Sequence, residues 1–151
     1  MIRKVQDTDY EQIVSLLQTH YPTHNRFSNS TPHEIIGYLL TIKDESYVYV
    51  TDEQIVGYAI LVQNKQNSTH SIFKYRHLAF TTETVGQELV AFCETQAMEF
   101  SETAKIELTI AKNETDIQLY ENMGYAKEAT LSNHYRMDED CYVYSKTLMR
   151  E

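Results

Sequence analysis

The stretch of residues 104–125 constrains the fold more than any other part of the chain. Residues 104–111 alternate between apolar and polar side chains, which predicts a β-strand. Asn113 can accept the free amide protons of a first helical turn, and Gly124 suits the left-handed residue that commonly ends a helix. We therefore expect a strand that leads into a short helix over residues 113–124.

Tyr120 lies in the middle of this predicted helix. Ile117 and Met123 lie about one turn on either side of it, so the tyrosine shares a face with apolar neighbours. Glu114 and Asp116 add negative charge where the helix dipole is positive. One interpretation is a capped helix whose tyrosine only packs, and the other is a tyrosine placed for chemistry.

The size and charge of the chain limit its function. We expect 151 residues to form one domain, 1–151, with a sizeable core. The formal charge of -9 argues against nucleic acid as a partner, because phosphate binding needs a basic surface. The same charge is compatible with a cationic or amine-bearing substrate.

Nothing in the sequence indicates secretion or a membrane. Residues 1–5 are followed by acidic residues without an apolar signal region, and no stretch is long and apolar enough to span a membrane. Cys93 and Cys141 are too few for a disulfide framework or a zinc cluster. Cys93 shares a predicted helical face with Leu89 and Ala97, which indicates a buried, inert thiol. We expect a cytoplasmic protein.

The remaining patterns predict alternating strands and helices. Capping boxes at residues 8–11 and 31–34, with Thr8 and Thr31 as caps, begin two helices, the first of which ends near His20. Gly57, inside a strand pattern, indicates a close approach by another part of the chain. The strands are expected at residues 2–5, 47–50, 54–62, 71–80, 104–111, 126–137 and 141–148, with turns at 52–53, 64–68 and 138–140 and a helix at 85–100.

Two histidines lie between the first two predicted helices. His20 and His24 have the spacing of helical metal ligands, but Pro22 interrupts the helix that would align them. No third ligand lies at a convincing spacing, so we expect no metal site. The polar loop of residues 20–27 could instead contact a substrate.

Residues 113–125 resemble the C-terminal signature of the GNAT family of N-acetyltransferases, which is roughly Asn-x-x-Ala-x-x-Leu-Tyr-Glu-x-x-Gly-Phe. The residues in register are Asn113, Leu119, Tyr120, Glu121 and Gly124. Asp116 stands where the family usually has Ala, and Tyr125 replaces Phe. The resemblance implies an α/β fold of the mixed α+β kind, the acyl-CoA N-acyltransferase fold, with a mixed twisted sheet of about seven strands and helices on both faces. The predicted order, β-α-α-β-β-β-α-β-α-β-β, is that of the family.

The resemblance also implies direct transfer of acetyl from acetyl-CoA, as cosubstrate, to an amine of a small molecule or peptide. Pantetheine would lie between the parallel strands 71–80 and 104–111. Backbone amides near Leu78 and Phe80 would hold the thioester carbonyl. Tyr120 would give its proton to the leaving thiolate, since a phenol and a thiolate have similar basicity.

The amine must be neutral to attack, which requires a base or a chain of water molecules. Glu107 is our first candidate for the base, and Tyr75 and His77 on the other strand are the alternatives. Each of the three could also be an ordinary strand residue.

The loop that would hold the pyrophosphate of coenzyme A departs from the family. Family members usually carry Arg/Gln-x-x-Gly-x-Gly/Ala here, because glycines at a helix N-terminus let amides surround the diphosphate. This chain reads Thr-Thr-Glu-Thr-Val-Gly-Gln over residues 81–87, so only Gly86 matches, and Glu83 adds an unfavourable charge. The expected cofactor contacts are Leu78, Ala79, Phe80, Thr84, Val85, Gly86, Gln87, Asn113 and Tyr120.

Two functions compete on this basis. The first is an active N-acetyltransferase, favoured by the signature at Asn113 and Tyr120. The second is a non-catalytic GNAT-like binding or regulatory module with weakened binding of coenzyme A, favoured by the altered loop at residues 81–86. An α/β domain unrelated to the family is a distant third. The sequence names no acceptor, and its tyrosine-rich strands could supply a homodimer surface.

Overall fold

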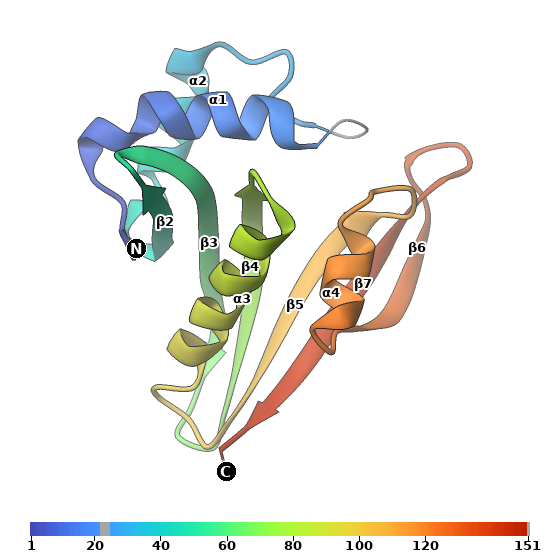
Figure 1. Cartoon of the computed structure of the whole chain (residues 1–151). Coiled ribbons are helices and arrows are strands. Elements are labelled where there is room, and N and C mark those ends of the chain that lie inside the picture. The colour runs from blue at the N-terminus through green and yellow to red at the C-terminus, as the bar shows by residue number, and fades with distance from the viewer. Residues whose placement is uncertain (22–24, 151) are drawn as a thin grey trace.

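Strands and helices follow one another in the predicted order in the computed structural model, which describes residues 1–21 and 25–150 (Figure 1). The strands are β1 Ile2–Lys4, β2 Ser46–Thr51, β3 Gln54–Gln66, β4 His70–Phe80, β5 Thr103–Ala111, β6 Ala126–Arg136 and β7 Glu139–Met149. The helices are α1 Tyr10–His20, α2 Pro32–Leu40, α3 Glu83–Ala97 and α4 Ile117–Asn122, with short 3-10 turns at Asp7–Asp9 and Lys43–Glu45. Among the described residues, no helix is long and apolar enough to cross a membrane.

All seven strands form one mixed sheet in the order β1-β2-β3-β4-β5-β7-β6, which confirms the predicted fold class. Only β4 and β5 are parallel; the other neighbours are antiparallel. Their parallel register joins His70–Lys74 to Thr103–Glu107 and goes no further. Beyond it the two halves of the sheet separate, as the diverging ribbons of Figure 1 show.

The apolar faces of the helices cover both faces of the sheet. One buried cluster joins α1 and α2 to the sheet, and the other joins α3 and α4 to it. Gly57 on β3 is where α3 comes closest: a Cβ there would lie 3.0 Å from Val85 Cγ1 and 3.2 Å from Leu89 Cδ2. This confirms the predicted close approach. Cys93 is buried in the same cluster, and burial raises the pKa of its thiol to about 12, so it stays a thiol at neutral pH.

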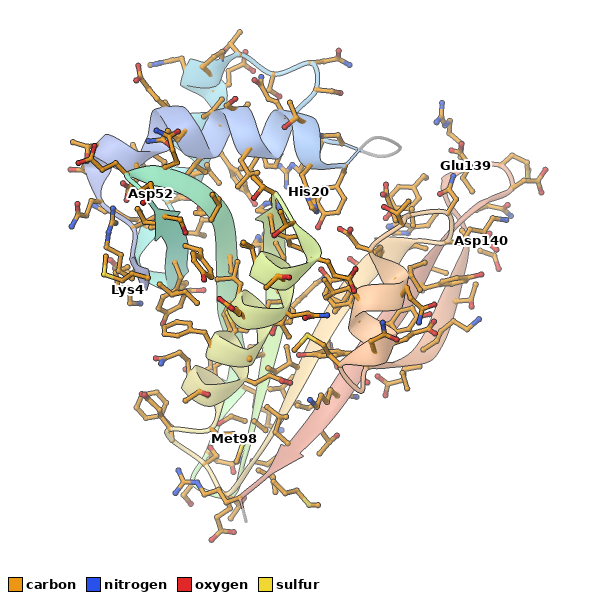
Figure 2. All side chains as sticks on the ribbon, viewed as in Figure 1. Lys4, His20, Asp52, Met98, Glu139 and Asp140 are labelled. Carbon is orange, nitrogen blue, oxygen red and sulfur yellow. The ribbon has the colours of Figure 1, made fainter. Side chains whose placement is uncertain are left out.

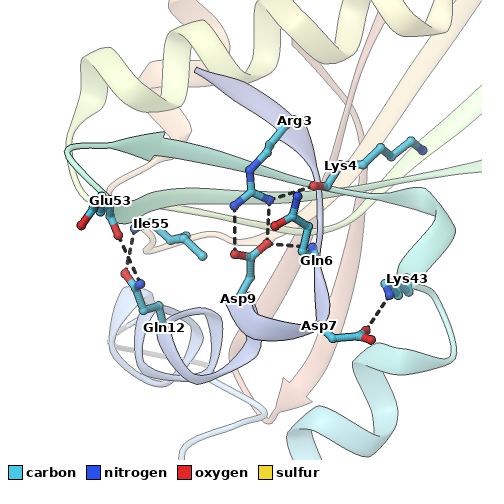
Figure 3. Close-up of polar contacts among 9 residues, drawn as sticks. All are labelled: Arg3, Lys4, Gln6, Asp7, Asp9, Gln12, Lys43, Glu53 and Ile55. Carbon is cyan, nitrogen blue, oxygen red and sulfur yellow. Dashed lines mark hydrogen bonds and ion pairs between the residues drawn. The ribbon is translucent and has the colours of Figure 1, made fainter.

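The start of α1 differs from the prediction. A 3-10 turn, Asp7–Asp9, precedes the helix, and Thr8 is not its cap. Asp9 Oδ2 instead accepts the Gln6 backbone N–H at 2.7 Å and an Arg3 Nη1 hydrogen at 2.7 Å (Figure 3). Arg3 lowers the pKa of the Asp9 carboxyl through this hydrogen bond. The charged partner on β1 thus favours Asp9 over the hydroxyl of Thr8.

The predicted capping box at the start of α2 is confirmed. Thr31 is the N-cap and its Oγ1 accepts the Glu34 backbone N–H at 3.2 Å. Pro32 occupies the first helical position, where its missing N–H costs nothing.

Several element ends lie a few residues from their predicted positions. Strand β3 continues to Gln66, and the turn falls at residues 67–69, where Asn67 Oδ1 accepts the His70 backbone N–H at 2.7 Å. The third helix ends at Ala97 rather than at residue 100. Phe100, which was expected on its apolar face, lies beyond the helix and is 59% exposed. Strand β7 begins at Glu139, so the predicted turn at 138–140 is shorter than expected.

Candidate active site

A cleft opens where β4 and β5 stop pairing. The last register pair joins Lys74 to Glu107, and beyond it a cavity of about 110 Å³ lies between the two strands. Its apolar walls come from β4 and β5, and its polar side chains are Tyr21, Tyr75, Arg76, His77, Thr109, Glu114, Tyr120 and Tyr135.

A bulge in β4 accompanies this opening. Tyr75 pairs with Leu61 and His77 with Ile60, so Arg76 has no partner in β3. A bulge of this kind bends and twists its strand, which turns the end of β4 away from β5.

Beyond the bulge, alternate residues of β4 direct their peptide groups to opposite sides. The Thr81 N–H bonds to Val56 O, and Ala79 pairs with Tyr58, so their peptide groups face β3. Leu78 and Phe80 therefore direct their N–H and C=O groups away from β3, toward the cleft. The predicted contact at Ala79 is thus on the wrong side of the strand to meet a ligand in the cleft.

Tyr120 lies on α4 at the wall of the cavity and is 2% exposed. Burial raises the pKa of its phenol well above the usual value, and neighbouring Tyr21 and Asp116 add to the shift. The hydroxyl therefore keeps its proton at neutral pH.

Gly124, with φ 93°, ends the helix as predicted, and the Tyr125 N–H bonds to Tyr120 O at 3.0 Å.

Tyr21 occupies the cleft between Tyr120 and β4. Its hydroxyl donates to Leu78 O at 2.5 Å, and its side chain is also hydrogen-bonded to Tyr120. Burial, with the charges of Asp116 and Glu114, raises the pKa of Tyr21. A line of hydrogen bonds therefore runs from Tyr120 through Tyr21 to the backbone of β4.

His20 joins the end of α1 to the ends of β4 and α4; Figure 2 shows it close to where α3 begins. Its Nε2 donates to Asp116 Oδ2 at 2.7 Å. Its Nδ1 lies 3.0 Å from Phe80 O and 3.3 Å from Phe80 N. In the neutral ring, Nδ1 accepts the Phe80 N–H. His24, whose spacing from His20 was weighed as a metal-ligand pattern, and the intervening Pro22 lie outside the described residues. Within residues 1–21 and 25–150, no group of His, Cys, Asp and Glu could hold a metal ion.

The predicted cap at Asn113 is wrong. The helix begins at Ile117 with Asp116 as the preceding residue, and Asn113 lies exposed in a turn. The Glu114 N–H bonds to Ala111 O at 3.1 Å, so the chain turns before it becomes helical. Because Asn113 lines neither cavity of the site, its expected contact with a cofactor has no support from its position.

A second cavity, of about 590 Å³, lies on the other side of His20. Its lining comes from the end of α1, from Thr81, Thr82 and Glu83 before and at the start of α3, and from the residues around the start of α4. Phe80 and Asp116 border this second cavity, whereas Leu78 and Tyr120 border the first. The contacts of His20 with Phe80 and Asp116 therefore lie on the boundary between the two cavities.

The start of α3 partly keeps the expected anion site. Thr82 is the N-cap, and its Oγ1 accepts the Val85 N–H at 3.3 Å. The Gly86 N–H bonds to Thr82 O at 3.0 Å, so the remaining first-turn amides are those of Glu83 and Thr84. The Glu83 carboxylate accepts a weak hydrogen bond from Gln87 Nε2 at 3.4 Å.

The absence of a side chain at Gly86 allows α3 to pack closely against Leu119 and Phe80, and it does not open space for a ligand. A Cβ at this position would lie 2.9 Å from Leu119 Cδ1 and 2.9 Å from the ring of Phe80. Thr84, Val85, Gly86 and Gln87 do not line the second cavity, whereas Thr81, Thr82 and Glu83 do. The predicted segment is therefore near the cavity, but the residues that face it are the preceding three.

The three candidate bases have different surroundings. Glu107 lies at the last pair of β4 and β5, outside the cavity lining, 3.5 Å from Lys105 Nζ. Tyr75 lines the cavity and shares a 3.2 Å hydrogen bond with the Tyr125 hydroxyl. His77 also lines it, with Nε2 2.9 Å from the Tyr38 hydroxyl.

Burial, with the charges of Arg26 and Arg76, lowers the pKa of His77 to about 4. A group with that pKa is a weak base, which argues against His77 as the group that deprotonates an ammonium. 

Sequence reasoning missed Tyr21 and Glu114 as members of the site. Tyr21 belongs to the loop expected near a substrate, but nothing local places its hydroxyl on β4. Glu114 had the appearance of a helix-dipole charge, yet it is buried at the cavity wall, 7% exposed. Only the meeting of β4, β5 and the end of α1 brings these two side chains together.

Solved structures share this fold. An aminoglycoside 6'-N-acetyltransferase from Enterococcus faecium superposes with a TM-score of 0.75 at 16% identity, covering 100% of this chain and 98% of that one. A ribosomal-protein-alanine N-acetyltransferase from Brucella melitensis gives 0.73 at 16% identity, covering 98% and 99%. An aminoglycoside 6'-N-acetyltransferase complexed with coenzyme A gives 0.74 at 14% identity, covering 100% and 98%. No curated protein sequence matches the chain.

The sequence itself establishes the family. The family model described as an acetyltransferase (GNAT) domain matches residues 2–142, nearly the whole chain. The protein belongs to the GNAT acetyltransferase family.

Proposed function

We propose that this protein transfers an acetyl group from acetyl-CoA to an amine by direct attack. The observation that carries the proposal is the position of Tyr120: its protonated hydroxyl lies in the cleft beyond the last β4–β5 pair, opposite the backbone of Leu78. Membership of the acetyltransferase family and the fold shared with an enzyme complexed with coenzyme A support it.

The chemistry follows from these groups. The amine nitrogen attacks the thioester carbonyl carbon, and the carbonyl oxygen takes up the negative charge. The Leu78 N–H, which strand alternation directs toward the cleft, would donate to that oxygen. As the C–S bond breaks, Tyr120 gives its proton to the thiolate, the extra proton of the amine passes to water, and water returns a proton to the Tyr120 phenolate.

Substrate binding requires the cleft to open from the form described here. A pantetheine arm that reaches Tyr120 from the start of α3 must pass the boundary between the two cavities, where His20 bonds to Phe80 and Asp116. Tyr21 must also leave Leu78 O for a thioester to reach the same peptide groups. Binding of acetyl-CoA is thus coupled to a movement at the end of α1.

A titration with acetyl-CoA and with coenzyme A, followed by thermal unfolding, tests the proposal first, because a ligand of the native state raises the melting temperature. Release of free thiol in the presence of primary amines then tests the transfer. Binding together with amine-dependent thiol release supports the enzyme. The proposal is contradicted if acetyl-CoA binds but no amine in a broad panel causes thiol release, with the wild type and Tyr120→Phe giving the same result.

The second function is a GNAT-like binding or regulatory module with weakened binding of coenzyme A. The specific observations in its favour are Glu83 at the second cavity and the occupation of Leu78 O by Tyr21. Failure of coenzyme A to bind at millimolar concentration would select this function over the first.

A further inference from the structure

Glu114 is a buried carboxylate with an unsatisfied oxygen. It follows β5 at the wall of the cavity that holds Tyr120, and it is 7% exposed. Its Oε1 is buried and has no hydrogen-bond partner among the described residues. The hydrogen bond that Glu114 does make is through its backbone N–H, to Ala111 O.

The other buried acidic residue among those described shows what such a group normally has. Asp9, 6% exposed, accepts two hydrogen bonds from Arg3 and one from the Gln6 backbone. An ionised carboxylate buried without a donor costs several kcal/mol, and a cationic donor offsets that cost. Asp9 has its cation within the protein. Glu114 has no such cation among residues 1–21 and 25–150.

The basic side chains that line the same cavity as Glu114 have other hydrogen-bond partners. Arg76 lines the same cavity, but its Nε donates to the Tyr38 hydroxyl at 3.3 Å, and it forms no ion pair with Glu114 within residues 1–21 and 25–150. His77 binds the same Tyr38 hydroxyl at 2.9 Å. Burial is the main reason why the pKa values of the Tyr21 and Tyr135 phenols are raised, and the charge of Glu114 adds to both shifts.

The size of the cavity limits what can bind there. About 110 Å³ holds roughly three or four water molecules, since each occupies about 30 Å³ in the liquid. A primary ammonium on a short aliphatic arm fits this space even in the closed form described here. The formal charge of -9 adds long-range attraction for such a cation.

We infer that Glu114 binds the ammonium group of the acceptor, which makes the acceptor a cationic primary amine on a flexible aliphatic arm. The inference rests on the proposed function in naming this amine the acceptor. Glu114 holds the ammonium in the cavity that Tyr120 also lines, and the ammonium gives one proton to water before its nitrogen attacks.

Binding of a simple ammonium tests the inference without acetyl-CoA. The probe is n-butylammonium chloride, and n-butanol is its uncharged counterpart of similar shape. Amide shifts in heteronuclear NMR spectra of the wild-type protein locate the site, and titration gives the affinity. We expect millimolar binding of butylammonium, with shifts centred on Glu114 and Tyr120, and no comparable effect of butanol. Equal binding of the alcohol, or shifts elsewhere only, overturns the inference.

Two variants sharpen the test. Glu114→Gln keeps the shape and removes the charge, and we expect it to weaken butylammonium binding about tenfold or more. Glu102→Gln makes the same chemical change at an exposed residue before β5 and should leave the affinity within about twofold. Unchanged affinity in Glu114→Gln overturns the inference. If that variant does not fold, the wild-type shift map and the comparison with butanol still decide.

Failure here is distinguishable from failure of the acetyltransferase proposal. If butylammonium binds at Glu114 but no amine is acetylated, the ammonium site stands and the proposed reaction falls. If amines are acetylated and Glu114→Gln leaves their KM unchanged, the reaction stands and the ammonium site falls.

Discussion

The imidazole of His20 and the carboxylate of Asp116 lie 2.7 Å apart, although 96 residues separate them in the chain. One residue ends α1 and the other immediately precedes α4, so this contact ties the two sides of the cleft together. With the Nδ1 contacts to Phe80, it holds the cleft in the closed form that coenzyme A would have to open under the proposed function.

Substitution of His20 should therefore lower the stability of the protein and raise its affinity for coenzyme A. His20→Ala removes the contacts with Asp116 and Phe80, and we expect the free energy of unfolding to fall by about 1–3 kcal/mol. Coenzyme A should bind about threefold or more tightly, because part of the opening cost is already removed. Denaturant unfolding and calorimetry measure the two effects. His33→Ala, an exposed histidine on α2, is the matched control. Weaker binding in His20→Ala would show that His20 contacts the ligand directly.

Tyr120→Phe tests the general acid. Loss of the proton donor should lower kcat by about a hundredfold or more while coenzyme A binding changes little. Stability should fall by about 1 kcal/mol, because the hydrogen bond with Tyr21 is lost. Tyr47→Phe on β2 removes a hydroxyl outside the two cavities of the site and should retain full turnover. Equal loss of binding and turnover, or of neither, would mean that Tyr120 only packs.

Glu83→Gln tests the charge at the start of α3. Glu83 lines the second cavity, so removing its charge should tighten coenzyme A binding by about 0.5 kcal/mol, a modest gain because solvent screens the repulsion. The gain should shrink at high salt, which calorimetry at two ionic strengths can measure. Low-micromolar binding by the wild type would show that the altered loop does not weaken the site.

His77 should make stability depend on pH. Its pKa is lowered from 6.5 to about 4 in the folded protein, so between these values the unfolded chain binds more protons than the folded one. Stability is therefore lost as the pH falls from about 6.5 to about 4, by at most about 3 kcal/mol for this group. His77→Gln should flatten this part of the profile relative to the wild type in urea unfolding at pH 7, 5.5 and 4.5. Parallel profiles for the two proteins would contradict the assignment.

The sequence predicted the parts of the fold that local patterns determine. Alternation located the strand that became β5, and the Thr31 box and Gly124 marked helix ends, because each depends on the residue itself and its near neighbours. Asn113 failed as a cap for a different reason: the turn at Glu114 delays the helix, and Asp116 is held by a histidine from α1. No local pattern carries that information.

The candidate site was predictable only in part. Tyr120, to which the resemblance gave a role, lines the cavity, and so do the candidate bases Tyr75 and His77. Glu107 and Ala79 do not line it, because Glu107 belongs to the last pair of β4 and β5 and Ala79 pairs with Tyr58 of β3. Tyr21 and Glu114 could not be assigned beforehand, since their proximity depends on the packing of α1 against the far end of the sheet.

Within the described sheet, β4 and β5 meet through five register pairs, from His70 with Thr103 to Lys74 with Glu107. These five pairs lie at the end of the strands opposite to Tyr120 and Phe80, so they can act as a hinge between the two halves of the sheet. A small rotation about this hinge would produce its largest displacement at the mouth of the cleft, and the hydrogen bonds between paired strands would be kept. The width of the cleft can therefore change while the pairing within each half of the sheet is kept.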